Sequence, residues 1–453
     1  MQPVVARIAA LAPDRSAAGI AAAVNRLIRS GELAAGSRLP TVRVLAAALG
    51  TSPTTVNEAW RSLVRIGSVR TEGRNGSYVS DGQRPGWPSR FWRIAGVAGE
   101  FAIDLSAGVP DATLLPPLPE PRRAPALSGY LDPPVLPRLE RLIRRYWQPV
   151  CEPERITVVD GSLDAADRVL HSLLRLGDRV LVENPTFPPL LDLLELIGAQ
   201  TVPVAVDAEG IRPDELDAAL DTGTAPPAML LLQPRAHNPT GASMTSARAT
   251  ALASVLARRA PSCVILEDDH AGDIGTAELA SLASHLPDRT VLIHSFSKAY
   301  GPDLRLAAVG GPAELVEPVI ARRNLGPAWS SRLLQQLLAD MVEDPVCASA
   351  VARARQTYAQ RRRALVHALA RRDVVVTARD GFNLWLDVAQ ERDALVVLAA
   401  RSIGAAPGRP FLAAPLAGDH LRITTAGLSV SDAEPIADAL ADAARQRYGP
   451  LHR

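Results

Sequence analysis

Short apolar runs recur along the chain beyond residue 150, and segments with helical periodicity lie between them. Runs of this length, joined by helical segments, are typical of buried strands linked by crossover helices. The pattern therefore predicts a doubly wound α/β sheet. Its five clearest strands are residues 156–159, 179–182, 229–232, 264–266 and 291–293.

The first eighty residues follow a different pattern, in which apolar positions recur at helical spacing. Ile20, Val24 and Leu27 share one face and predict a helix over residues 17–30, with Gly31 as its C-cap. This segment is therefore expected to fold as a separate helical module.

Two further helices are expected in this module. Leu45 and Leu49 belong to the second, and residues 50–52 form the turn after it. The third helix begins at Pro53, because proline is favoured at the first helical position and Ser52 is a good N-cap. Helix, turn and helix in this order are typical of DNA-binding modules.

The third helix has an apolar stripe on one side and leaves Thr54, Thr55 and Asn57 on or near its free face. Side chains on such a face can reach base edges and phosphates. Two short strands around the Gly-rich turn at residues 73–77 then predict a wing.

Charge sets the N-terminal segment apart. Residues 1–80 hold ten arginines against four acidic residues, although the whole chain of 453 residues has a net charge of only +1. A basic segment of this kind fits binding to nucleic acid. Three scattered cysteines indicate neither a disulfide framework nor a zinc site, and no apolar run suits a signal peptide or a membrane span. We therefore expect a cytoplasmic protein without a metal site and without a membrane partner.

The segment LPTVRVLAAALGTSPTTVNEAWRSLVRIGSV, followed four residues later by RNGSYV, resembles the winged helix-turn-helix of the GntR superfamily. The resemblance covers residues 15–80 and implies double-stranded DNA as a partner. For any single residue a solvated surface position remains the alternative, and Pro53 departs from the basic residue that many relatives have there. The DNA contacts that the resemblance implies are Arg43, Ser52, Thr54, Thr55, Asn57 and Arg74.

Chemically active residues follow the five apolar runs, at the edge where such sheets bind ligands. Gly161, Ser162 and Leu163 open a helix, where free backbone N–H groups suit an anion such as phosphate. The later runs are followed by an aromatic ring, an amide, an acidic cluster, a serine and a lysine. They are Phe187, Asn238, residues 267–269, Ser295 and Lys298, with Arg305 seven residues beyond the lysine.

Lys298 is the only lysine of the chain, since the other 48 of its 49 basic residues are arginines. An aldehyde cofactor with a basic ring nitrogen and a phosphate needs an amine, a carboxylate and phosphate donors. Pyridoxal phosphate (PLP) meets all these requirements.

Residues 105–428 resemble the fold type I PLP enzymes, which have the aspartate aminotransferase fold, and the order of the two domains resembles the MocR subfamily of GntR regulators. The resemblance implies that Lys298 forms the Schiff base, Asp268 protonates the ring nitrogen, and Asn238 binds the phenolic oxygen. It further implies Phe187 for ring stacking, Ser162, the Leu163 amide, Ser295 and Arg305 for the phosphate, Tyr130 for the phosphate in a second protomer, and Arg422 for an effector carboxylate.

Two positions depart from the family pattern. His270 stands where relatives usually have a tyrosine against the phenolic oxygen of the cofactor. A histidine can donate there as a tyrosine does, but it titrates near neutrality, and a packing role is the alternative. The glycine usual after Pro134 is also missing, which leaves the substrate side of the site open.

These observations favour a homodimeric transcription regulator that responds to PLP, to an amine or to an amino acid. A working aminotransferase with an accessory DNA-binding domain is the alternative, and a DNA-binding protein whose PLP fold only dimerises is a third. The expected domains are a DNA-binding domain at 1–80, a linker at 81–103 and a PLP-binding domain at 104–453. Its large part spans about 150–330 and its small part about 358–453, with strands at 374–376 and 383–386.

Overall fold

The computed structural model describes residues 2–12, 15–65, 69–71, 76–79, 90, 101–119, 129–222 and 225–446. They fall into two compact units. The first comprises residues 1–89 with the short segments 174–179 and 191–201, and the second comprises the remainder. The expected linker lies outside the described residues, apart from residue 90 and residues 101–103.

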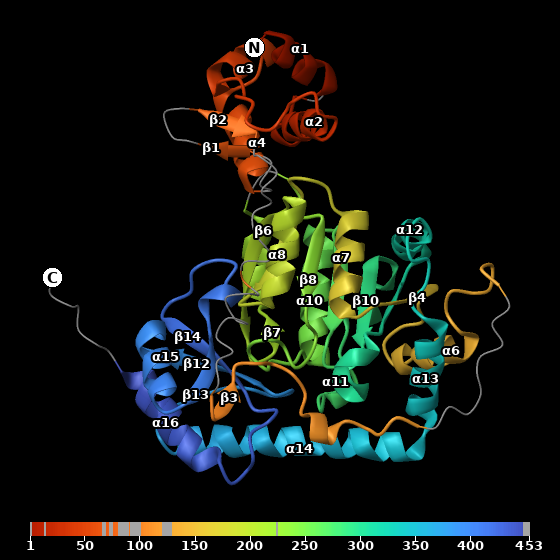
Figure 1. Ribbon diagram of the computed structural model, residues 1–453, viewed down its shortest axis with the longest axis vertical. Helices are drawn as coiled ribbons and strands as arrows, with labels where there is room; N and C mark the ends of the chain where they lie inside the picture. The colour runs from red at the N-terminus through yellow and green to blue at the C-terminus, as the bar shows by residue number, and fades with distance from the viewer. Residues whose placement is uncertain are drawn as a thin grey trace. The chain divides into compact units, whose positions relative to one another are not determined.

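The described residues of the N-terminal module form four helices and a two-stranded sheet (Figure 1). Its core is built by the apolar stripes of the helices, and Leu45, Leu49 and Trp60 are among the buried residues. The three predicted helices and the wing strands are confirmed, whereas the first helix was not predicted. The elements are α1 (Gln2–Leu11), α2 (Ala17–Arg29), α3 (Val42–Leu49), α4 (Pro53–Arg65), β1 (Val69–Thr71) and β2 (Ser77–Val79), with β1 antiparallel to β2.

Side-chain caps fix the helix starts of this module. The hydroxyl of Thr41 accepts from the amide of Val44, and that of Ser52 accepts from the amide of Thr55 at 3.0 Å. Each bond satisfies an amide that the first helical turn leaves without a partner. Between α3 and α4, Gly50 has φ +63°, a left-handed conformation that ends α3 and turns the chain.

An eight-stranded sheet forms the centre of the second unit, in the order β4-β11-β10-β9-β8-β5-β6-β7. The neighbours β10 and β9, β9 and β8, and β8 and β5 are parallel, whereas β11 is antiparallel to both β10 and β4. The five predicted strands are present, and β6, β7 and β11 were not predicted. The bounds are β4 (Arg155–Val159), β5 (Arg179–Asn184), β6 (Gln200–Asp207), β7 (Gly210–Ile211), β8 (Met229–Leu232), β9 (Val264–Asp269), β10 (Thr290–Ser295) and β11 (Ala307–Gly311).

Helices accompany this sheet, and in Figure 1 α7 and α10 lie in front of it. Two buried apolar clusters, one of which includes Trp147 and Leu306 and the other Leu230 and Leu256, fill the space between helices and strands. The helices are α6 (Pro137–Trp147), α7 (Ser162–Leu173), α8 (Pro188–Ile197), α9 (Pro213–Leu220), α10 (Ser246–Arg259), α11 (Ser297–Tyr300), α12 (Ala313–Asn324) and α13 (Arg332–Glu343).

A second sheet of four strands, in the order β12-β14-β13-β3, forms the smaller part of this unit. The early strand β3 pairs in parallel with β13, although the two are 300 residues apart in the sequence. The long helix α14 leads into this part along the lower edge of the view in Figure 1. The elements are β3 (Ile103–Leu105), α14 (Pro345–Ala370), β12 (Asn383–Val388), α15 (Glu391–Ala400), β13 (Ile403–Pro407), β14 (Asp419–Thr424) and α16 (Ala433–Arg445).

The strand expected at residues 374–376 is wrong, whereas the one at 383–386 is confirmed within β12. Val374 and Val376 pack against the apolar cluster of the small part, but Val375 between them is 80% exposed. The segment therefore follows the apolar spacing of an extended chain without pairing to a sheet.

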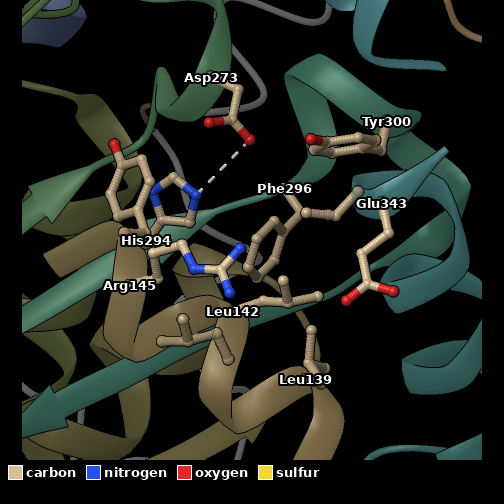
Figure 2. A pocket seen from close by; sticks show the side chains of 11 residues that line it. Leu139, Leu142, Arg145, Asp273, His294, Phe296, Tyr300 and Glu343 are labelled. Carbon is tan, nitrogen blue, oxygen red and sulfur yellow. Dashed lines mark ion pairs between the residues drawn. The ribbon is translucent and has the colours of Figure 1, made fainter. Parts of the chain in front are cut away.

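A cavity of about 540 Å³ opens beside α6, β10 and α13 (Figure 2). It is lined mainly by apolar and aromatic side chains, and by His294 from the end of β10. Among the residues that the structure describes, none of the helices is long and apolar enough to cross a membrane.

Candidate functional site

The ends of three parallel strands bring the predicted cofactor residues to one edge of the large sheet. Asp268 lies near the end of β9, Ser295 ends β10, and Gln233 directly follows β8. The carboxyl ends of parallel neighbours meet at the same edge, where doubly wound sheets bind ligands. The short helix α11 begins two residues after β10 and presents Lys298 to this edge.

The amine of Lys298 is held beside His270. It contacts the ring nitrogen Nδ1 of His270 and donates to the backbone carbonyl of the same residue at 3.2 Å. Burial lowers the pKa of Lys298 from its ordinary value to about 8, against the opposing charges of Asp268 and Asp269. A lysine with this pKa presents a substantial neutral fraction near physiological pH, which nucleophilic attack on an aldehyde requires.

The second ring nitrogen of His270 is engaged by the backbone. Nε2 lies 2.9 Å from the carbonyl oxygen of Ala236, so it carries the proton and donates it there. Burial, followed by the charge of Lys298, lowers the pKa of His270 well below its ordinary value. The expectation that this histidine titrates near neutrality is therefore wrong, and its Nδ1 faces Lys298 as an acceptor.

Two buried oxygen atoms at the site have no partner among the described residues. The Oδ2 of Asp268 accepts from the amide of Gln233 at 3.1 Å, whereas its Oδ1 has no hydrogen bond. The side-chain oxygen of Asn238 also lacks one. Burial raises the pKa of Asp268 to about 6, opposed by its hydrogen bond to Gln233 and by Lys298. The unpartnered carboxylate oxygen fits the protonated ring nitrogen of PLP, and the unpartnered amide oxygen fits a phenolic O–H group.

A second group of predicted residues forms a cradle for an anion. Gly161 has φ +103°, and a Cβ atom there would lie 3.1 Å from the guanidinium of Arg305. Arg305 donates to the carbonyl of Asp160 at 3.2 Å. Ser162 begins α7, so the first amides of this helix and the arginine face the same space. The arrangement fits a phosphate group.

The remaining predicted residues lie at different depths. Arg422 is buried on β14, donates to the carbonyl of Ser106 and approaches Gly108, where a Cβ atom would lie 2.6 Å from its guanidinium. Burial lowers the pKa of Arg422 to about 10. Phe187, half-buried, comes directly before α8. Tyr130 is 89% exposed, with its ring centroid 6.1 Å from that of Trp329.

The predicted DNA-contacting residues occupy the helix-turn-helix. Arg43, Ser52, Thr54 and Asn57 are exposed, and Thr55 is half-buried. The side chains of Ser52 and Thr55 also bond to each other at 2.8 Å, so both are engaged in the cap of α4. Arg74 lies outside the described residues.

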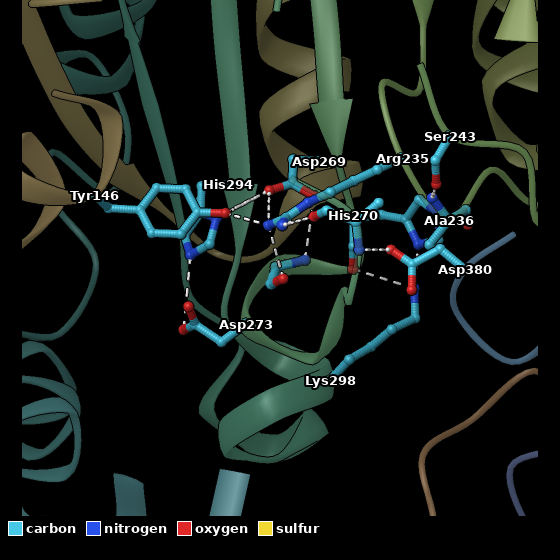
Figure 3. A network of polar contacts seen from close by, with 12 residues as sticks. Tyr146, Arg235, Ala236, Ser243, Asp269, His270, Asp273, His294, Lys298 and Asp380 are labelled. Carbon is cyan, nitrogen blue, oxygen red and sulfur yellow. Dashed lines mark hydrogen bonds and ion pairs between the residues drawn. The ribbon is translucent and has the colours of Figure 1, made fainter. Parts of the chain in front are cut away.

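Sequence reasoning missed a polar network behind Lys298 (Figure 3). Arg235 forms a buried ion pair with Asp269 at 2.8 Å, and the hydroxyl of Tyr146 donates to the same carboxylate at 2.8 Å. The Nδ1 of His294 lies 3.3 Å from it. Nearby ion pairing with Arg235 holds the pKa of Asp269 well below its ordinary value despite burial. The second acid at the end of the fourth apolar run was the only local signal of this network.

Metal binding has no comparable support. The part of the chain that the structure describes contains no group of three or more side chains able to hold a metal ion together. The chemistry of the site thus consists of one amine, one carboxylate, an amide and an anion cradle.

Two family models match the chain in its two parts. Residues 16–79 match the model for bacterial regulatory proteins of the gntR family, and residues 102–440 match that for aminotransferase class I and II. The vitamin B6 salvage pathway transcriptional repressor PtsJ of Salmonella typhimurium is 34% identical over 91% of this chain and 95% of its own. The probable rhizopine catabolism regulatory protein MocR of Rhizobium meliloti is 26% identical over 83% of this chain and 79% of its own.

The chain belongs to the MocR-type GntR regulators. It is therefore a transcription regulator with a DNA-binding module and an aminotransferase-like module. The fold of the second module also appears in solved structures. The match to the alpha-aminoadipate aminotransferase LysN of Thermus thermophilus covers 78% of this chain and 94% of LysN, with a TM-score of 0.67 and 22% sequence identity. At this identity the likeness shows the fold alone.

Proposed function

We propose that this MocR-type regulator binds PLP at Lys298 and that the bound cofactor changes the affinity of the chain for its DNA operator. The observation that carries the proposal is that the edge of the sheet holds both the only lysine and a buried carboxylate whose Oδ1 has no hydrogen-bond partner among the described residues. Burying a carboxylate oxygen without a partner costs free energy, and such groups cluster at functional sites.

Each residue of the site has a separate task in this proposal. Lys298 holds the cofactor through its amine, and Asp268 keeps the ring nitrogen protonated through its free Oδ1. Asn238 orients the phenolic oxygen, and Phe187 stacks on the ring. When bound, PLP supplies an aldehyde that condenses with primary amines.

The phosphate is held at a separate place. Ser162, the amide of Leu163, Ser295 and Arg305 bind it, and the arginine can do so with two parallel N–H bonds. The position of Arg305 beside Gly161 supports this assignment, because the missing Cβ leaves the guanidinium close to the start of α7.

The effector is proposed to be PLP itself, with or without an amine or amino acid. Arg422 is buried, and its Nε has no hydrogen bond to any described residue, so a carboxylate would supply the missing partner. The relative PtsJ is named for vitamin B6 salvage, and we extend that class of target genes to this chain.

We further propose a cytoplasmic homodimer. The exposed ring of Tyr130 is available to a second copy, and paired DNA-binding modules fit an operator with two half-sites. The DNA is then contacted by Arg43, Thr54, Asn57 and Arg74. Ser52 and Thr55 contact it only with the hydrogen-bonding capacity that the cap of α4 leaves unused.

Repeated transamination is the second candidate, because the amine and the carboxylate of an aminotransferase are both in position. The test measures two quantities on the full chain with PLP. One is binding to DNA from upstream of its own gene, in competition with random DNA and at several salt concentrations. The other is the number of turnovers with amino acids and keto acids. Specific, salt-sensitive binding without repeated turnover is expected. Repeated turnover without specific binding would make the chain an aminotransferase.

A further inference from the structure

The cavity beside α6 and α13 contains a polar corner whose residues have no proposed role in binding PLP or DNA. The corner is formed by His294 and Asp273, which lie together at one end of the cavity in Figure 2. The volume of about 540 Å³ falls within the range of small-molecule sites.

His294 presents an unpartnered nitrogen to this corner. Its side chain is 1% exposed, and its Nε2 has no hydrogen bond among the described residues. Nδ1 lies 3.3 Å from the carboxylate of Asp269, so Nε2 is the ring nitrogen that faces the corner. Leaving such a nitrogen buried without a hydrogen bond costs free energy.

Asp273 supplies a carboxylate next to this nitrogen. Its Oδ2 lies 3.9 Å from Nε2 of His294, within ion-pair range but too far for a hydrogen bond. The carboxylate is also bonded to the hydroxyl of Tyr300. A cation with N–H donors can contact both groups, because the ring nitrogen lacks a hydrogen bond and the carboxylate attracts positive charge.

The rest of the lining favours an organic ligand over a bare ion. Apolar and aromatic side chains surround the corner, and Glu343 is already paired with Arg138 at 2.5 Å. Arg145 also lines the cavity, and no ion pair involving it is found in the described part of the chain. The apolar lining residues are Leu139, Leu142, Ile143, Phe296 and Val342.

We infer that this cavity is a second small-molecule site, which binds an organic ammonium with an apolar or aromatic body. The ammonium donates an N–H to His294 Nε2 and places its charge against the carboxylate of Asp273, and the body packs on the apolar wall. Where the ligand also has a carboxylate, Arg145 is the group that can bind it. A simple amine and an amino acid thus bind at the same corner, and only the amino acid also contacts Arg145.

The site is distinct from the cofactor site. Asp268 and Asp269 are adjacent on β9, so their side chains point to opposite faces of the sheet. Asp269 is aligned with His294 of β10 and lies on the face of the cavity, whereas Asp268 is on the face of Lys298. A ligand in the cavity therefore needs no reaction with PLP.

The probe is N,N-dimethyl-2-phenylethylamine, a tertiary amine that is charged at neutral pH and cannot form an imine with PLP. Binding to the full chain with PLP is followed by titration calorimetry. Saturation with one molecule per chain is expected, and the uncharged 2-phenylethanol is expected to bind at least about tenfold more weakly. N,N-dimethylphenylalanine tests whether the carboxylate adds affinity through Arg145.

Three variants test the assignment. Asp273→Asn is expected to weaken binding of the amine about tenfold, whereas Glu278→Gln, at an exposed acid outside the cavity, leaves it unchanged. Val342→Phe fills the cavity without removing a charge and is expected to abolish binding in a chain of normal melting temperature. The inference is wrong if the amine does not bind at millimolar concentration, if 2-phenylethanol binds equally well, or if Asp273→Asn or Val342→Phe binds as the wild type does.

Discussion

The amine of Lys298 contacts Nδ1 of His270, and the other ring nitrogen of that histidine is bonded to the carbonyl of Ala236. The histidine therefore meets the lysine as an acceptor, which differs from the donating role expected of it at the cofactor. The lowered pKa of Lys298 has another cause, namely burial, which the charges of Asp268 and Asp269 oppose.

The pH dependence of Lys298 reactivity follows from its lowered pKa. The neutral amine is the reactive form, so labelling of Lys298 by an amine-reactive reagent is expected to rise with pH around a midpoint of about 8. In the unfolded chain the midpoint moves to about 10.4. The measurement is the labelled fraction of the Lys298 peptide by mass spectrometry in the PLP-free protein. A midpoint above 10 in the folded chain would contradict the environment described here.

Asp268→Asn is expected to stabilise the PLP-free protein while weakening PLP binding. The folded carboxyl has a pKa of about 6, against about 3.9 unfolded, so its ionised form is disfavoured by folding. This cost is fully present above pH 6 and disappears as the pH falls from 6 to below 4. We expect the variant to gain on the order of 2 kcal/mol at pH 8.

The same variant should show almost no gain in stability near pH 4, which thermal unfolding at several pH values measures. Its affinity for PLP is expected to fall about tenfold or more, because the hydrogen bond to a charged ring nitrogen is lost. A lower melting temperature at pH 8 together with unchanged PLP affinity would show that Asp268 is structural.

Ser52→Ala and Asn57→Ala separate capping from DNA contact. Ser52 caps α4, so its removal is expected to cost about 1 kcal/mol of module stability. Asn57 is exposed and its removal should leave stability unchanged while weakening specific DNA binding. Thermal unfolding and operator titration measure the two effects. If Asn57→Ala binds DNA as tightly as the wild type, this face of α4 does not contact the operator.

Arg422→Gln tests recognition of a carboxylate. The guanidinium is buried and binds a backbone carbonyl. In the wild type an amino acid is expected to bind more tightly than the amine that lacks its carboxylate, and in the variant this preference is expected to fall about tenfold. Changes in the visible absorption of the lysine-bound cofactor report both titrations. An unchanged preference would assign the carboxylate to another group.

A ligand in the second cavity is expected to lower the pKa of Lys298. His294 bonds to Asp269, Asp269 pairs with Arg235, and the next residue along the chain binds His270. An added cation at the corner lowers the pKa of another cation, so saturating N,N-dimethyl-2-phenylethylamine should accelerate Lys298 labelling below pH 8. Asp273→Asn is the control. An unchanged rate in a chain that calorimetry shows to be saturated would rule out this coupling.

The sequence predicted five strands of the large sheet, and it placed the candidate site residues at or just after their ends. Asp268 and Lys298 belong to local motifs, and each motif follows an apolar run that marks its strand. The antiparallel strand β11 reads Ala-Ala-Val-Gly-Gly, which has little strand propensity, and forms because it is enclosed between β10 and β4.

Contacts between residues far apart in the chain had no comparable signal in the sequence. Tyr146 bonds to Asp269 across 123 residues, and Arg235 pairs with the same acid across 34. No periodicity links such positions, so the network and the cavity beside it emerge only in three dimensions. Val375 shows the opposite failure, since three valines in a row indicate a strand where the chain has no strand partner.

Control of DNA affinity by PLP at Lys298 is tested by comparing dissociation constants for DNA from upstream of the gene. The chain is titrated with and without PLP at one salt concentration, and visible absorption verifies that the cofactor is bound. We expect the two constants to differ about tenfold in the wild type and to coincide in Lys298→Ala. Equal constants for the wild type with and without bound PLP would contradict the claim.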